Sequence, residues 1–288
     1  KGQIFGGRER KRRGEVAKDR APKFSFDEGL QVLPDTLSAR LGAAVRLNSN
    51  VTRLTQTAGG WTLDVRDAGG EASSEHGAVI FCGTAPKLAE LEMSYGRAAL
   101  PREPEIGAAP PHRLAKLDLS AFSEIRYPPV ASVVLGFRRE DVAHPCVGFG
   151  MLIPKSSGFK SLGTLFSSSL FPNRAPAGHL TLTTYIGGER YPELASLPEE
   201  KLVALVGEDL RALPGVRGQP TFQHCVFYPK AIPQYNVGYG RFKDLMTKIE
   251  AQAPGFFLAG HYRDGVSLSD SSLSGINVAD RVGKALPT

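Results

Sequence analysis

The sequence predicts a mixed α/β fold of two units, in which a sheet-rich middle segment is inserted into a unit built from both ends of the chain. Runs typical of strands alternate with amphipathic helix patterns, which favours layers of sheet and helix. Strand-like runs follow one another at short spacing between residues 130 and 188. The chain closes on an apolar strand pattern, a glycine turn and a helix pattern at 256–282.

The first periodic segment, 26–42, predicts a short helix that ends at Gly42. Its apolar face comprises Leu30, Leu33, Leu37 and Leu41. Strands are expected at 44–56 and 60–67, joined by an Ala-Gly-Gly turn. A third strand is expected at 77–83, and a helix starts at Pro86.

Residues 93–112 are rich in Pro, Gly and Ala, and we interpret them as a crossing between domains. The expected strands beyond them begin at Val130 and continue as 148–154, 161–171, 179–188 and 222–229. Helices are expected at 199–215 and 241–252, the second after an irregular crossing. We therefore expect residues 1–85 and 241–288 to form one domain and residues 86–240 to form the inserted one.

Composition restricts the class of protein. The net charge is +6, and much of the excess lies in GGRERKRRGEVAKDR, residues 6–20. Such a run can meet nucleic acid or anionic lipid, but it contains no aromatic residue, so we favour a solvated segment and expect no nucleic-acid partner. The cysteines, Cys82, Cys146 and Cys225, lie far apart, which predicts a reducing compartment, no secretion, no disulfide framework and no metal site.

The closing stretch has the form of an anion site. Backbone N–H groups at a helix start lack helical partners, and the helix opening at Ser269–Ser272 would present them beside Gly260 and Gly265. An ordinary helix capped by Ser269 explains the same pattern. Asp270 in the first turn would repel a phosphate, so it would reach a sugar hydroxyl or only stabilise the helix.

Four stretches carry a resemblance. FLAGHYRDGVSLSDSSLSG, residues 257–275, is similar to the last FAD-contacting segment of the flavin amine oxidase superfamily. Residues 26–54, the run GTLFSSSLFPNRAP within 148–178, and AIPQY within 227–242 resemble the oxygen-dependent protoporphyrinogen oxidases, in particular plant-plastid and related bacterial forms. The resemblance implies a partial FAD-binding domain of the flavin-amine-oxidase type and an inserted mixed-sheet substrate domain.

The resemblance also implies a chemistry. FAD would oxidise protoporphyrinogen IX to protoporphyrin IX by hydride transfer to flavin N5, with molecular oxygen as acceptor. The matching cofactor positions are Val51, Gly260, His261, Gly265, Val266 and Ser267, and the matching substrate positions are Leu152 and Phe171. No catalytic acid or base is assigned. Peripheral membrane association, a homodimer and a location at the cytoplasmic side of a bacterial membrane or in a plastid follow from the family.

One feature of the family is not matched. FGGRERKRRG has the wrong spacing for a G-x-G-x-x-G phosphate turn, so we expect this polypeptide alone to bind FAD weakly or not at all. The alternatives are another flavin amine oxidase or desaturase-type oxidoreductase, and a truncated non-catalytic remnant.

Overall fold

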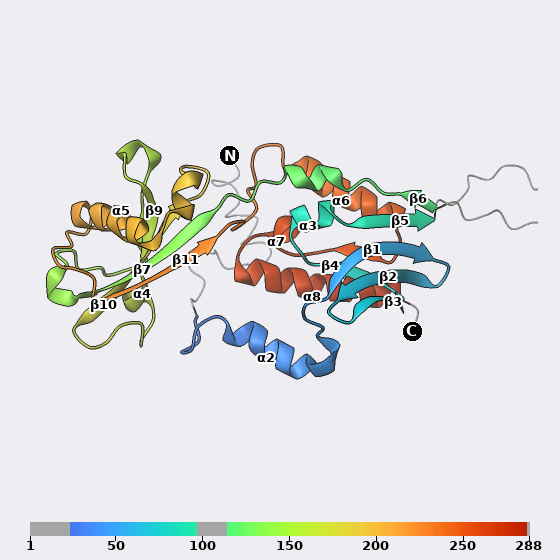
Figure 1. Ribbon diagram of the computed structural model, residues 1–288, viewed down its shortest axis with the longest axis horizontal. Helices are drawn as coiled ribbons and strands as arrows, with labels where there is room; N and C mark the ends of the chain where they lie inside the picture. The colour runs from blue at the N-terminus through green and yellow to red at the C-terminus, as the bar shows by residue number, and fades with distance from the viewer. Residues whose placement is uncertain (1–23, 97–113, 287–288) are drawn as a thin grey trace, which may run out of the picture.

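A computed structural model describes residues 24–96 and 114–286, and the predicted unstructured opening, 1–23, lies outside this part. Figure 1 shows two units joined by two neighbouring stretches of chain. The first unit contains β1–β6, α3 and α6–α8, and the second contains β7–β11 and α5. Each has its own hydrophobic core, so the predicted mixed α/β fold of two units is confirmed.

The first unit is built on a mixed sheet with strand order β3-β2-β1-β5-β6. Its strands are β1 (Asn50–Thr57), β2 (Gly60–Asp67), β3 (Gly70–His76), β5 (Glu92–Gly96) and β6 (Leu114–Lys116). β1 to β3 form an antiparallel meander, whereas β5 runs parallel to β1. Trp61 of β2 and Leu54 of β1 are buried in the core of this unit.

A second, two-stranded parallel sheet pairs β4 (Val79–Phe81) with β12 (Phe256–Leu258), which are distant in sequence. Four helices belong to this unit: α3 (Ala85–Ala89), α6 (Gly240–Gln252), α7 (His261–Asp264) and α8 (Leu268–Ala285). The predicted helices after Pro86 and at 241–252 and the closing strand, turn and helix are therefore present.

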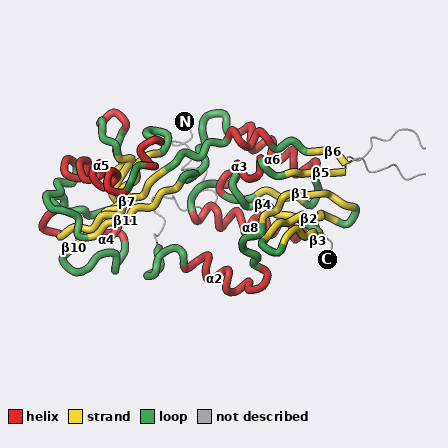
Figure 2. Tube along the Cα trace, in the orientation of Figure 1, coloured by secondary structure: helices red, strands yellow, loops and turns green. Residues whose placement is uncertain are grey.

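The second unit is an entirely antiparallel sheet with strand order β11-β7-β10-β9-β8 (Figure 2). Its strands are β7 (Val130–Arg138), β8 (Gly150–Leu152), β9 (Ser161–Phe166), β10 (His179–Gly187) and β11 (Phe222–Tyr228). Its helices are α4 (Ser167–Leu170) and α5 (Glu199–Ala212). Every strand pair of this sheet is antiparallel, whereas β5 runs parallel to β1 in the first unit, so the mixed sheet lies in the first unit and not, as predicted, in the inserted one.

The packing differs from the predicted domain boundary at residue 85. Leu88, Met93 and Phe122 lie in the core of the first unit, because β5 pairs with β1 and α3 packs on the turn at Ser120–Glu124. Met93 is therefore in a strand and not in a crossing, and most of the expected crossing (97–112) lies outside the described residues. The predicted strand 161–171 is also interrupted, since α4 begins at Ser167.

The first described helix, α2 (Val32–Leu41), ends at Gly42 with φ of +53°, as predicted. None of its residues is buried, and Leu37 and Leu41 are 52% and 60% exposed. Figure 1 shows α2 lying apart from both sheets. The predicted apolar face therefore contacts neither core in the described residues. Single-turn 3-10 helices complete the fold at Gly42–Ala44, Ser120–Glu124, Arg139–Asp141, Lys155–Ser157 and Pro192–Ser196.

Candidate functional site

Two glycines frame the turn that follows β12. Gly260 has φ of +107° and Gly265 has φ of +130°, values that side-chain-bearing residues rarely adopt. At Gly260 a Cβ would lie 3.4 Å from the carbonyl oxygen of Cys82, so this turn runs against the carboxyl end of β4. Between the glycines α7 makes a single helical turn, which the sequence did not predict. Positive φ and close backbone approach together explain the glycines.

The N-cap of the helix after the turn lies two residues earlier in the chain than predicted. Ser267, and not Ser269, is the N-cap of α8: its hydroxyl accepts the amide of Asp270 at 3.1 Å. The Asp270 carboxylate accepts the amide of Ser267 at 3.4 Å, which completes a capping box. A Cβ at Gly265 would lie 2.6 Å from that carboxylate. The carboxylate of Asp270 thus stabilises the helix start, one of the two roles expected for it.

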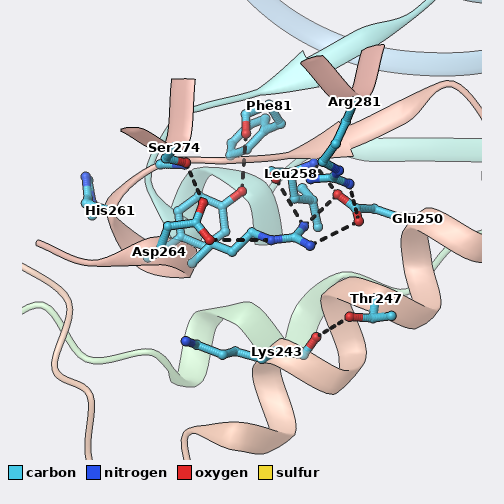
Figure 3. A network of polar contacts seen from close by, with 12 residues as sticks. Phe81, Lys243, Thr247, Glu250, Leu258, His261, Asp264, Ser274 and Arg281 are labelled. Atoms are coloured by element: carbon cyan, nitrogen blue, oxygen red, sulfur yellow. Dashed lines mark hydrogen bonds and ion pairs between the residues drawn. The ribbon is translucent and has the colours of Figure 1, made fainter. Parts of the chain in front are cut away.

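Hydrogen bonds tie the turn to α8. Ser274 accepts the amide of Gly260 at 2.8 Å and donates to the carboxylate of Asp264 (Figure 3). Ser274 is buried, so the turn is fixed in position by side-chain contacts within the first unit. Val266, between Gly265 and the cap, is 42% exposed.

His261 begins α7 and contacts tyrosines from other parts of the chain. Its Nε2 lies 3.1 Å from the hydroxyl of Tyr127, and its carbonyl accepts the hydroxyl of Tyr235 at 2.6 Å. Burial lowers the pKa of His261, so the imidazole is neutral at pH 7. Through these contacts the side chain and the main chain of His261 both hold the turn in place.

A buried ion cluster lies behind the turn (Figure 3). Glu250 of α6 accepts from Arg263 and from Arg281, each at 2.6 Å. The same carboxylate accepts the amide of Leu258 at 2.7 Å, and Arg263 donates to the carbonyl of Leu258 at 3.0 Å. Side chains therefore supply the hydrogen-bond partners for the amide and carbonyl of Leu258, on the edge of β12 that faces away from β4.

Val51 lies near the same end of β4. It lines a pocket of about 500 Å³ together with Leu63, Phe81, Gly83 and Lys87, and a β-bulge follows it in β1. Since β4 and β12 are parallel, their carboxyl ends meet at one edge, where open α/β sheets bind ligands. The structure therefore brings Val51 and the Gly260–Gly265 turn to the residues that follow β4. Val51 lines the same pocket as Gly83, and Gly260 lies against the carbonyl of Cys82.

The second unit has one covered and one open sheet face. α5 covers the face that carries Val133, Leu135, Phe166 and Leu182. The opposite face, carrying Val134, Leu165, Thr183 and Tyr185, lines a cavity of about 940 Å³. Phe171 contributes to that cavity, as its predicted substrate role requires. Leu152 pairs with Gly163 two residues before Leu165, so it lies on the same face, but it is 92% exposed and does not line the cavity.

Arg174 is a residue of this cavity that sequence reasoning did not single out. Its guanidinium donates to the carbonyl of Asp27 at 2.8 Å and to the hydroxyl of Ser25 at 2.9 Å, and it also reaches the carbonyl of Phe26. The side chain thereby joins residues 25–27, which lead into α2, to the part of the cavity lining that contains Phe171. The available signal was a cation in the otherwise uncharged GTLFSSSLFPNRAP run.

The family model for flavin-containing amine oxidoreductases matches residues 3–283. This chain belongs to that family. The match covers both units, which confirms the flavin class of the predicted cofactor and the predicted resemblance. The Gly260–Gly265 turn and the open sheet face are accordingly parts of a flavin oxidoreductase fold.

Named relatives of this family member include protoporphyrinogen oxidases. The chain is 36% identical over 269 residues to protoporphyrinogen oxidase 2, chloroplastic/mitochondrial, of Arabidopsis thaliana. The matching region covers 90% of this chain and 50% of the relative. It is 34% identical to the mitochondrial protoporphyrinogen oxidase of Nicotiana tabacum, with the same coverage. The chain thus spans about half the length of these relatives.

A solved structure shows the same fold. A proposed protoporphyrinogen oxidase from Exiguobacterium sp. 255-15 superposes with a TM-score of 0.69 at 20% identity, over 91% of this chain and 52% of that one. In the described part of the flavin oxidoreductase chain, no helix is both long and apolar enough to cross a membrane.

Proposed function

We propose that this chain forms part of an FAD-dependent protoporphyrinogen oxidase that converts protoporphyrinogen IX to protoporphyrin IX, with molecular oxygen as acceptor. The observation that carries the proposal is its similarity to the Arabidopsis protoporphyrinogen oxidase across nine-tenths of the chain. We assign the first unit to the cofactor and the second unit to the substrate. By the same similarity, we propose a peripheral membrane association, a homodimer and a plastid or bacterial-membrane location.

The residues of the first unit fit a dinucleotide. The Gly265–Val266–Ser267 backbone leads into the N-terminus of an 18-residue helix, whose capping box uses the amides of Ser267 and Asp270 and places the Asp270 carboxylate there. This backbone would therefore meet an uncharged part of the cofactor, such as a ring carbonyl or a sugar hydroxyl, and not a phosphate. Gly260 and Gly265 allow close approach of a ligand to the main chain, and Val51 lines the pocket at the other side of β4. A bound flavin supplies the two-electron acceptor for the oxidation.

The second unit fits a large apolar ring system. The cavity of about 940 Å³ lies within the range of small-molecule sites, about 300–1000 Å³. Phe171 offers an aromatic face inside it, and Leu152 extends the apolar face of the sheet at its edge. Such a surface would orient the substrate and exclude water. The proposal assigns no side chain of this chain as a catalytic acid or base.

Purified chain should be titrated with FAD and assayed with protoporphyrinogen IX in air, following porphyrin fluorescence. A second assay adds, as a separate polypeptide, the half of the Arabidopsis relative that this chain does not match. We expect weak or no flavin retention by the chain alone and porphyrin formation in the combined sample. A stoichiometric flavin spectrum of the chain alone would contradict the first expectation. If the combined sample binds FAD and still forms no porphyrin, the proposed function is contradicted.

A further inference from the structure

The two units are joined by two connections that lie side by side. One, residues 126–129, leads into β7, and the other, residues 229–238, leads from β11 to α6. The amide of Gln234 donates to the carbonyl of Arg126 at 2.9 Å, and the amide of Ala231 donates to the carbonyl of Pro128 at 3.3 Å. The connections are therefore held in register by main-chain hydrogen bonds.

Each connection carries one tyrosine, and both tyrosines contact His261 in the Gly260–Gly265 turn. Tyr127 from the first connection contacts the imidazole of His261 at 3.1 Å, and Tyr235 from the second donates to its carbonyl at 2.6 Å. The contacts use different atoms of His261, so neither hydroxyl replaces the other.

The chemistry of Tyr127 and His261 suits a permanent contact. The oxygen of Tyr127 also accepts the amide of Ala85 at 3.2 Å, which leaves its hydrogen available for the Nε2 of a neutral imidazole. Burial lowers the pKa of His261 and raises the pKa of Tyr127. Both groups are therefore uncharged near neutral pH, and protonation does not interrupt the contact there.

Tyr235 is itself held by the first core. Its ring stacks on Tyr239 with centroids 4.3 Å apart, and the hydroxyl of Tyr239 donates to the carbonyl of Tyr262. Burial raises the pKa of Tyr235 to about 12, so it remains a donor at neutral pH. A rigid path therefore runs from the second connection to the turn.

We propose that His261 is a positioning residue that fixes the second unit relative to the Gly260–Gly265 turn through Tyr127 and Tyr235. Its consequence for catalysis rests on the proposed function: substrate on the open sheet face would be held at a set position relative to the flavin. Loss of both hydroxyls would then lower kcat and leave KM unchanged.

The geometric part is tested without any flavin. Spin labels attached through non-canonical side chains at positions 75 and 208, exposed in the first and second unit, report the distance between units. We expect the distance distribution to broaden in the double variant Tyr127→Phe with Tyr235→Phe, and to stay narrow in the control Tyr191→Phe. A distribution as narrow in the double variant as in the wild type would overturn the proposal.

Hydrogen exchange provides a second measurement in the milder single variant Tyr235→Phe. The amide of Gln234 should exchange about fivefold faster, as loss of one hydrogen bond allows. Unchanged exchange at Gln234 would overturn the proposal. His261→Asn combined with Tyr127→Phe should disturb the distance no more than either change alone, because they remove the same contact. Additive broadening in that pair would overturn the assignment of Tyr127 to the imidazole.

Kinetics of the combined sample, to which the separate polypeptide from the Arabidopsis relative is added, separates this proposal from the proposed function. In the double variant we expect a lower kcat at unchanged KM. A raised KM at unchanged kcat would overturn the positioning role. If the wild-type protein shows no porphyrin formation, the proposed function fails, while the distance measurement still decides whether His261 positions the units.

Discussion

The carboxylate of Glu250 lies 2.6 Å from the guanidinium of Arg263, and the two side chains are only 13% and 18% exposed. Glu250 also accepts from Arg281 and from the amide of Leu258, so one carboxylate joins α6, α7, α8 and β12. β12, the strand that leads into the Gly260–Gly265 turn, is therefore held by a buried charge network.

Glu250→Gln should destabilise the protein by about 3–5 kcal/mol, because it leaves buried guanidinium charge without its partner. Urea unfolding measures the change. Glu71→Gln, which breaks the exposed pair of Glu71 with Arg66, is the matched control and should alter stability little. Equal effects of the two substitutions would contradict a structural role for the cluster.

Acid should weaken the same cluster. Burial by itself raises the pKa of Glu250, but hydrogen bonds from Arg281 and Arg263 outweigh it and hold the pKa below its usual value. A depressed folded-state pKa adds stability that is fully present above the unfolded value, about 4.3, and is lost as pH falls through the folded value. The free energy of unfolding should therefore fall on acidification, and fall less steeply in Glu250→Gln. Parallel pH profiles would contradict this.

Gly265→Ala should disrupt the start of α8. The new methyl group would meet the Asp270 carboxylate at 2.6 Å, at a backbone φ of +130°, for a cost of about 1–3 kcal/mol. We also expect reduced flavin retention in the combined sample described above. The control is Gly275→Ala, a helical position with open space at the added Cβ, which should be neutral or stabilising. Thermal unfolding and flavin spectra measure both.

Phe171→Ala should weaken porphyrinogen binding by about 10- to 100-fold in KM, since burying a large apolar side chain contributes about 1.5–3 kcal/mol. Leu152→Ala should have a smaller effect, because Leu152 is 92% exposed and does not line the cavity. Steady-state kinetics of the two variants in the combined sample described above compares the two effects. A larger KM change in Leu152→Ala would place the substrate at the sheet edge.

Arg174→Met should release the start of the α2 segment from the second unit. Three acceptors in residues 25–27 lose their donor, so limited proteolysis should cut this region faster. Arg138→Met, which removes an exposed arginine of β7, is the control. Unchanged cleavage in Arg174→Met would show that other contacts hold the segment.

Local pattern was sufficient for several elements. α5 carries Leu202, Val206 and Leu210 on its buried face, at the spacing that the sequence predicts. The closing strand, glycines and helix were also predicted, because each depends on residues close together in the chain. The exact cap, Ser267 in place of Ser269, was missed because several serines compete for that position.

Strand pairing between distant segments could not be predicted in the same way. β5 contains Met93 between polar and small residues and forms because it pairs with β1, some forty residues earlier. The polar strand β3 exists because β2 provides its partner. These strands depend on their neighbours more than on their own composition.

The sequence by itself determined the mixed α/β class, the flavin family and the glycine turn, because periodicity, backbone freedom and long matching stretches are properties of neighbouring residues. Only the tertiary structure decided that Phe171 lines the cavity on the open face of the second sheet, that Arg174 reaches Asp27, and that Tyr127 and Tyr235 meet at His261. The hydrogen bonds among these contacts join residues 26 to 147 positions apart, and the face that lines the cavity depends on strand register, so both arise only when the whole chain has packed.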